Sequence, residues 1–119
     1  MLSDMAIAYY NQGYSCSCCI IKGAEKLYGI SAKDTQRALS GINNGFGIGI
    51  MCSVPISCIM VLGLLYKDEN TLKQKRLEFL LAFKKTYKSF NCSEIQSKIY
   101  SCEEVIRKGC DILENLTEN

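Results

Sequence analysis

A chain of 119 residues has the length of one ordinary domain and is long enough to bury a real core. Its 48% hydrophobic and 22% charged residues are typical of a globular protein and exclude a disordered one. The net charge of +2 comes from interspersed acidic and basic residues, so it gives no electrostatic basis for binding nucleic acid or an anionic membrane. We therefore expect residues 1–119 to form a single domain.

Helix signals dominate the chain, whereas strand signals are weak because β-branched runs are short and strict alternation is absent. Serine or threonine at candidate N-caps, and glycine after the last apolar residue, mark where helices begin and end. The sequence thus predicts an all-α fold, a compact bundle of about five to six helices. In chain order the expected segments are 5–10, Ser15 to Gly29, Ser31 to Gly41, Ser53 to about Tyr66, Thr71 to about Phe90, a short turn at Ser93, and a last helix from Ser101.

Two of these segments carry an apolar stripe with helical spacing, which predicts the face that each turns to the core. In the long helix from Thr71 the stripe consists of Leu72, Phe79, Leu80, Phe83, Tyr87 and Phe90. In the last helix it consists of Val105, Gly109, Ile112 and Leu116.

The uncharged stretch between Arg37 and Lys67 raises the alternative of a membrane span. The helix that restarts at Pro55 has about 12 residues, or about 18 Å of length, whereas a hydrocarbon core needs about 30 Å. We therefore expect a buried core helix and no membrane span. The stretch from Met1 to Tyr10 lacks a basic region and a long apolar run, so we expect no signal peptide and a cytoplasmic location.

The chain has eight cysteines and no histidine, and this is its most informative feature. In a reducing cytoplasm, cysteines are expected to be thiols or metal ligands and not a disulfide framework. The lack of histidine excludes Cys–His and Ser–His catalytic pairs, histidine-ligated haem and Cys/His zinc fingers. A bound metal would have mostly thiolate ligands, which favours iron–sulfur, zinc or Cu(I).

Four of the cysteines lie beside a serine at a predicted helix start. The partial positive charge of a helix N-terminus stabilises a thiolate, so a thiol pKa of about 8.5 falls to roughly 3.5–7.5 there. The alternative is that small, polarisable cysteines simply fill the core, and their wide spacing is unlike a local motif such as C-x-x-C. The four candidate ligands are Cys16, Cys52, Cys92 and Cys102.

The other four cysteines are expected to play lesser roles. Cys18 and Cys19 extend the first site, where Cys18 could share a metal with Cys16 or exchange disulfides with it; the alternative is that either one is core. Cys58 and Cys110 lie in the middle of apolar helices, so we expect them to be buried as small hydrophobic residues. Three tyrosines before the first site are expected to pack in or around the core: Tyr9, Tyr10 and Tyr14.

A glycine-rich loop, from Gly41 to Gly49, leads into Cys52. Its second half, GFGIG, lacks the Gly-Lys-Ser/Thr ending of a phosphate-binding loop and does not fit G-x-G-x-x-G. Glycines here would let backbones approach closely and could aim N–H groups at sulfur. The alternative is a plain turn between helices.

This cysteine pattern resembles the redox-active protein family C_GCAxxG_C_C. The resemblance spans Tyr14 to Leu113, and it departs from the family pattern after the second cysteine, where Ser53, Val54 and Ser57 replace the usual small residues. Cys18, Cys19, Cys58 and Cys110 are additional to the family's four. The matching segments are Tyr14-Ser15-Cys16, the glycine run with Cys52, Met60 to Tyr66, Phe90-Asn91-Cys92, and Cys102 to Val105.

The resemblance implies an all-helical, redox-active protein, and a similar cysteine module in split-Soret-type cytochromes suggests an iron–sulfur centre. We expect the four candidate ligands to hold such a cluster for electron transfer with a redox partner on a separate chain. A metal-free thiol–disulfide oxidoreductase with Cys16 or Cys52 as the attacking thiol is one alternative. A structural zinc site with four thiolates is the other. Whether the protein is an enzyme, and whether it forms a homodimer, stay open.

Overall fold

The computed structural model describes residues 1–42, 45–97 and 101–117. These residues form seven α-helices and one π-helical turn, with no strand beyond an isolated antiparallel bridge between Met51 and Asn91. The prediction of an all-α fold is confirmed, with one helix more than expected. The elements are α1 (Leu2–Asn11), α2 (Cys18–Tyr28), α3 (Lys33–Leu39), η1 (Gly45–Gly49), α4 (Ser53–Leu65), α5 (Glu69–Tyr87), α6 (Cys92–Ser97) and α7 (Cys102–Thr117).

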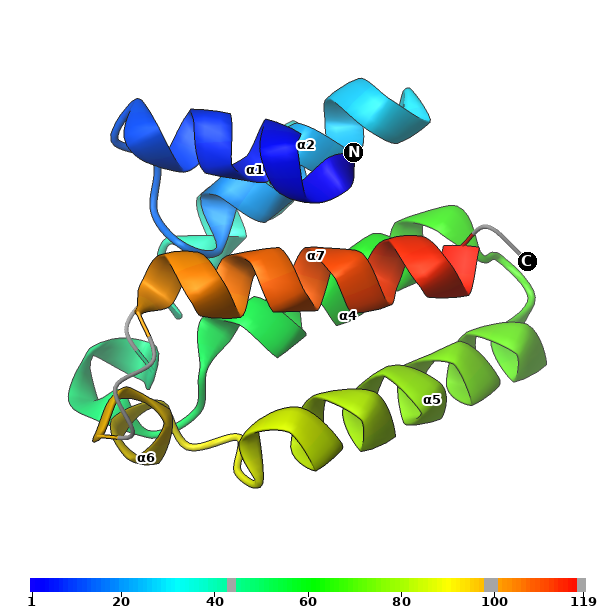
Figure 1. Cartoon of the computed structure of the whole chain (residues 1–119). Coiled ribbons are helices and arrows are strands. Elements are labelled where there is room, and N and C mark those ends of the chain that lie inside the picture. Colours follow the sequence, from blue (N-terminus) through cyan, green and yellow to red (C-terminus); the bar gives the residue numbers. More distant parts are fainter. Residues whose placement is uncertain (43–44, 98–100, 118–119) are drawn as a thin grey trace.

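The helices form three layers (Figure 1). α1 and α2 pack on one another at the top, α7 and α4 lie in the middle, and α5 covers the opposite side. α7 contacts α1, α4 and α5, and α4 contacts α2, α5 and α7, so these two helices form the centre of the bundle. The starts of α6 and α7 and the turn η1 gather at one end of the molecule, on the left of Figure 1.

Several of the expected helix boundaries are confirmed by capping contacts. The Ser15 hydroxyl accepts the Cys18 N–H at 3.3 Å, although α2 begins at Cys18 with Ser17 as its N-cap, two residues later than expected. The Ser101 hydroxyl accepts the Glu104 N–H at 3.1 Å at the start of α7. Gly29 ends α2 with φ of 67°, the left-handed conformation that glycine adopts at little cost.

Other expected caps are wrong, because a neighbouring side chain takes the role. Asp68, and not Thr71, caps α5 by accepting the Thr71 N–H at 3.0 Å. The α3 start has no side-chain cap; Glu25 of α2 accepts the Ala32 N–H at 3.2 Å instead, so a tertiary contact replaces the expected capping box at Ser31.

Two further starts also differ from expectation. Cys52 is the N-cap of α4, so Ser53 is the first residue inside that helix. The short turn expected at Ser93 is the six-residue helix α6, where Asn91 Oδ1 accepts the Glu94 N–H at 3.1 Å. At α6 both Asn91 and Ser93 are good capping residues, whereas Cys52 caps α4 without a side-chain hydrogen bond.

The second half of the predicted glycine-rich loop is a π-helical turn, η1, so a plain loop is wrong there. Residues 43 and 44 of that loop lie outside the described residues. Gly49 ends the turn with φ of 73°, and an added Cβ would lie only 2.5 Å from Ser93 Oγ. The close contact at Gly49 is with a side chain and not with another backbone: the Ser93 hydroxyl donates to the Gly49 carbonyl at 2.9 Å, which joins the turn to the start of α6.

The predicted apolar stripes form the core. Phe79, Phe83 and Tyr87 are buried, and the other members of the α5 stripe are half-buried. In α7 the buried face is wider than predicted, because Ile106, Cys110 and Leu113 join it. α4 is buried along most of its length. No helix among the described residues is long and apolar enough to cross a membrane.

α4 and α7 approach so closely that one glycine is needed at their crossing. A Cβ added at Gly109 would lie 2.5 Å from Val54 Cγ1 and 3.5 Å from Cys58 Sγ. Real Cβ atoms do not come within 2.5 Å of another carbon, so a larger residue forces the two helices apart.

We expect Gly109→Ala to lower the free energy of unfolding by about 1–3 kcal/mol, because overpacking outweighs the gain in helix propensity. Gly63→Ala is the matched control, since nothing lies within 4 Å of its added Cβ. That change should stabilise the protein by about 0.5–1 kcal/mol. Urea unfolding of both variants checks the prediction, which fails if the two have equal stability.

Candidate redox site

Three of the four predicted ligands lie at a helix start, whereas Cys16 lies outside any helix. Cys52 is the N-cap of α4, whereas Cys92 and Cys102 are the first residues of α6 and α7. Cys16 lies two residues before α2. We call these four residues the four-cysteine site.

Backbone pairing holds two members of the site together. The Cys52 N–H donates to the Phe90 carbonyl at 2.7 Å, and the Cys92 N–H donates to the Ile50 carbonyl at 2.9 Å. These bonds flank the isolated bridge between the two segments, so the starts of α4 and α6 are side by side. Both cysteines are nearly buried, with 8% of each exposed.

The four cysteines are also near enough to affect one another's ionisation. Burial raises the pKa of Cys52 to about 12, and negative charge on Cys16, Cys92 and Cys102 raises it further. Burial also raises the pKa of Cys92, with added contributions from Cys102 and Cys16. The structure therefore brings together, at one end of the bundle, four cysteines that are far apart in the sequence.

The predicted low pKa at the helix starts is wrong for two of the four thiols. At Cys52 the Val54 N–H, which belongs to the first turn of α4, does lower the pKa, but burial is the larger effect. The thiol of Cys92 is likewise raised by burial. Burial therefore disfavours the thiolate of Cys52 in the metal-free protein, so half-buried Cys16 is the better placed of the two candidate attacking thiols.

Two hydroxyl groups contact the site, and both were missed as site residues in the sequence. Ser53 Oγ lies 3.0 Å from Cys16 Sγ. The Tyr10 side chain forms a hydrogen bond with Cys102, and its pKa is raised by burial and then by Cys102, Cys16 and Cys19. The only sequence signal for Ser53 was its departure from the small residue usual at that position. Tyr10 was assigned to packing alone.

The thiols of Cys18 and Cys19 have different hydrogen-bond partners. The Cys18 thiol, half-buried, donates to the Gln36 carbonyl of α3 at 3.5 Å. The Cys19 thiol is fully buried and donates to the Cys16 carbonyl at 3.5 Å. Burial, followed by charge on Cys16 and Cys18, raises the pKa of Cys19 to about 12. Cys19 is thus core, which is one of the two roles considered for it.

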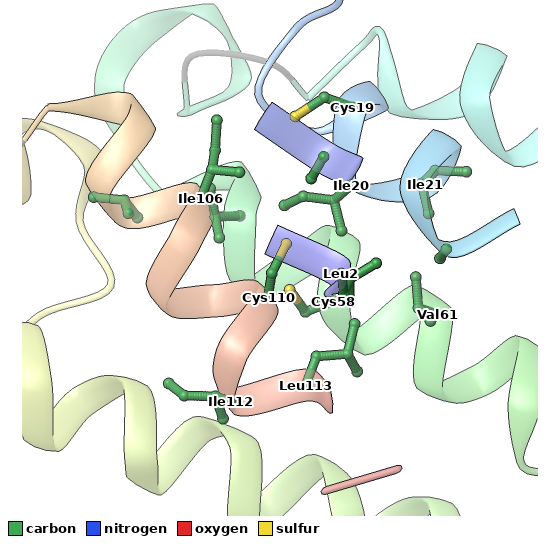
Figure 2. Close-up of a cluster of buried hydrophobic side chains, with 14 of the residues drawn as sticks. Leu2, Cys19, Ile20, Ile21, Cys58, Val61, Ile106, Cys110, Ile112 and Leu113 are labelled. Carbon is green, nitrogen blue, oxygen red and sulfur yellow. The ribbon is translucent and has the colours of Figure 1, made fainter. Parts of the chain in front are cut away.

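Cys58 and Cys110 are core residues, as predicted. Both are fully buried, and they lie side by side where α4 meets α7, among Leu2, Ile106 and Leu113 (Figure 2). Burial raises the pKa of both thiols, and the charge of Cys110 adds most to the remaining shift of Cys58. Neither thiol reaches solvent, so both behave as small apolar side chains.

The raised thiol pKa values predict that the reduced, metal-free protein loses stability in alkali. Unfolded thiols ionise near pH 8.5, whereas Cys19 and Cys52 keep their protons in the fold up to about pH 12. Their contribution is therefore complete below about pH 8.5 and is lost as the pH rises toward 12, by up to about 1.4 kcal/mol per pH unit for each thiol.

Urea unfolding under anaerobic conditions, between about pH 8 and pH 11, checks this prediction. Cys19→Ala removes one of the thiols whose pKa is raised, so the free energy of unfolding should fall less steeply with pH in this variant. Equal slopes for the variant and the unmodified protein would contradict the assignment.

The thiols of the four-cysteine site are suitable ligands for a soft metal, but they lie too far apart to bind one metal ion together. Within residues 1–42, 45–97 and 101–117, no three His, Cys, Asp or Glu side chains lie close enough to hold a metal ion. A zinc ion needs its four sulfurs at about 2.3 Å from one centre. The thiolates that bind an iron–sulfur cluster are ligands of different irons, so they lie farther apart than the ligands of a single ion.

The chain matches one family model, described as "Putative redox-active protein (C_GCAxxG_C_C)", over residues 14–116. That range includes all eight cysteines and every helix except α1. No curated protein and no solved structure matches the chain.

Proposed function

The chain belongs to the putative redox-active protein family C_GCAxxG_C_C, and on that premise we propose that the four-cysteine site holds an iron–sulfur cluster. The protein would then transfer electrons to and from a redox partner on a separate chain. The observation that carries the proposal is the backbone pairing that sets Cys52 beside Cys92, with Ser53, the residue after Cys52, 3.0 Å from Cys16 Sγ.

A cluster bound by four thiolates supplies one-electron chemistry. The chain's own contribution is to offset negative charge at the sulfurs. The N-termini of α4 and α7 lie at the site and carry partial positive charge. The Val54 N–H stabilises the thiolate form of Cys52, and the hydroxyls of Ser53 and Tyr10 contact Cys16 and Cys102.

Charge stabilisation also explains why buried thiols suit a bound cluster. In metal-free protein, burial keeps the proton on Cys52 because a lone thiolate is costly to bury. Cys52 would hold a metal centre as a thiolate, without that proton, and the low dielectric would then strengthen the contacts that this chain makes to the sulfur. A structural zinc site gains no support from the spacing of these thiols.

A second function, metal-free thiol–disulfide exchange, is favoured by one contact. Cys16 is half-buried, and the Ser53 hydroxyl at 3.0 Å can stabilise its thiolate. In that case the Cys16 thiolate attacks a disulfide of a partner protein and releases one partner thiolate. Cys18 then attacks the mixed disulfide, which leaves a Cys16–Cys18 bond and a reduced partner.

A redox titration of the anaerobically purified protein separates the two functions. An iron–sulfur carrier is expected to follow a one-electron Nernst slope, about 59 mV per tenfold change in ratio. A dithiol–disulfide couple follows a two-electron slope of about 30 mV. A colourless protein with a two-electron slope would overturn the cluster proposal in favour of thiol exchange.

A further inference from the structure

Two thiols outside the four-cysteine site are neighbours in the core. Cys58 of α4 and Cys110 of α7 are fully buried and lie side by side where these helices meet, among apolar side chains (Figure 2). Of the charged groups around Cys58, Cys110 raises its pKa most, which agrees with this placement. The fold thus pairs two cysteines that are far apart in the sequence and that the redox site does not use.

The two helices come close because α7 has a glycine at the crossing. A Cβ added at Gly109 would lie 3.5 Å from Cys58 Sγ and 2.5 Å from Val54 Cγ1, so the backbone of α7 rests directly on these α4 side chains. Cys110 is the next residue, with its Cα about 3.8 Å from that of Gly109. The sulfur of Cys58 therefore lies against the segment that carries Cys110. Disulfides form only between segments this close, because the two Cβ atoms must come within about 3.5–4.5 Å.

We propose that Cys58 and Cys110 form a reversible disulfide that joins α4 to α7 when a low-molecular-weight disulfide acts as the oxidant. One cysteine sulfur attacks the oxidant, its S–S bond breaks, and one small thiol leaves. The second cysteine sulfur then attacks the first, the new S–S bond forms, and the second small thiol leaves. The protein gives up two electrons and two protons, and the oxidant takes them up as its two thiols. This inference goes beyond the proposed function and uses neither a metal nor a member of the four-cysteine site.

Burial makes this reaction slow in both directions. The oxidant reaches the pair only when the crossing of α4 and α7 opens locally, because both thiols are fully buried. Burial also raises the pKa of both thiols, so little thiolate is available for attack. The finished disulfide carries no charge, so the apolar surroundings accommodate it and shield it from reducing thiols. The pair is therefore a persistent covalent lock between two helices and not a catalytic dithiol.

The test treats the folded protein with an excess of bis(2-hydroxyethyl) disulfide, blocks the remaining thiols with N-ethylmaleimide in mild acid, and maps the bonds by trypsin digestion and mass spectrometry. Trypsin releases Cys110 as the only cysteine of the fragment 109–119, and it releases Cys58 on the fragment 38–67. We expect these two fragments to be joined in the oxidised protein and to separate after reduction in denaturant.

Two variants assign the bond to its cysteines. The joined fragments should be absent from Cys58→Ala, which still carries Cys52 on the fragment 38–67. They should be present in Cys19→Ala, which removes the other buried thiol that raises the pKa of Cys110. Circular dichroism shows whether each variant is folded.

Thermal unfolding gives an independent readout. The bond closes a long loop that contains α5 and α6, so it restricts the unfolded chain. The oxidised protein should therefore melt roughly 5–15 °C above the reduced protein, whereas Cys58→Ala should show no such gain after the same treatment.

Absence of the joined fragments from the oxidised, folded protein would overturn the inference. A bond from Cys110 to Cys19 or to Cys52 would overturn it as well. None of these readouts depends on metal content, so the test stands even if the cluster proposal fails.

Discussion

Replacing Cys52 with serine is expected to abolish iron and sulfide binding. Cys52 links the members of the site, because its segment pairs with that of Cys92 and its neighbour Ser53 contacts Cys16. A serine hydroxyl is a hard donor that keeps its proton at neutral pH, so it is a poor substitute for thiolate. Iron and acid-labile sulfide per chain, measured after anaerobic purification, check this result. Cys16→Ser, Cys92→Ser and Cys102→Ser are expected to behave in the same way.

Cys58→Ala is the matched control for these variants. Cys58 lies six residues further along the chain in α4, is fully buried, and is a core residue outside the four-cysteine site. The change should leave iron content unchanged and lower the free energy of unfolding by roughly 1 kcal/mol through lost packing. Iron at the level of the unmodified protein in Cys52→Ser would show that the ligand assignment is wrong.

The second large effect is expected at Phe83, where the core meets the site. Its ring is fully buried and lies 5.8 Å from that of Phe90, 4.9 Å from that of Tyr87 and 6.2 Å from that of Phe79. Phe83→Ala removes this ring and leaves a cavity, so it should cost about 3–5 kcal/mol of unfolding free energy. Urea unfolding of the metal-free protein measures the loss.

Phe83→Ala should also weaken the site, because the Phe90 carbonyl that accepts the Cys52 N–H loses its packing support. Leu81→Ala, two residues away on α5, is the control, since that side chain is 62% exposed. Its effect should lie within about 0.5 kcal/mol of zero. A loss in Phe83→Ala no larger than the loss in Leu81→Ala would contradict the placement of this ring in the core.

The local chemistry of the chain predicted most of the helices, because each relies on nearby signals. Ser15 and Ser101 cap helix starts with their own side chains, and Gly29 ends α2 in a conformation that favours glycine. The capping residue was predicted wrongly where a side chain from another part of the sequence supplied the hydrogen bond. Glu25 serves the start of α3 from another helix, and no pattern near Ser31 could reveal that contact.

In the four-cysteine site, too, the features set by nearby residues could be predicted and those set by distant residues could not. Helix-start cysteines were readable from the sequence, but their convergence depends on backbone bonds between the segments around Cys52 and Cys92, which carry no sequence signature. The depth of burial, which reverses the expected pKa of Cys52, is likewise a property of the packed bundle. The contact of Ser53 with Cys16 joins two such distant segments and could not be predicted.

The central claim is that the four-cysteine site holds an iron–sulfur cluster, and the most direct test is the composition of the unmodified protein. Iron, zinc and acid-labile sulfide should be measured together with a visible spectrum on protein purified without oxygen. We expect iron with matching sulfide, and charge-transfer bands in the visible. A colourless protein with neither iron nor sulfide would contradict the account.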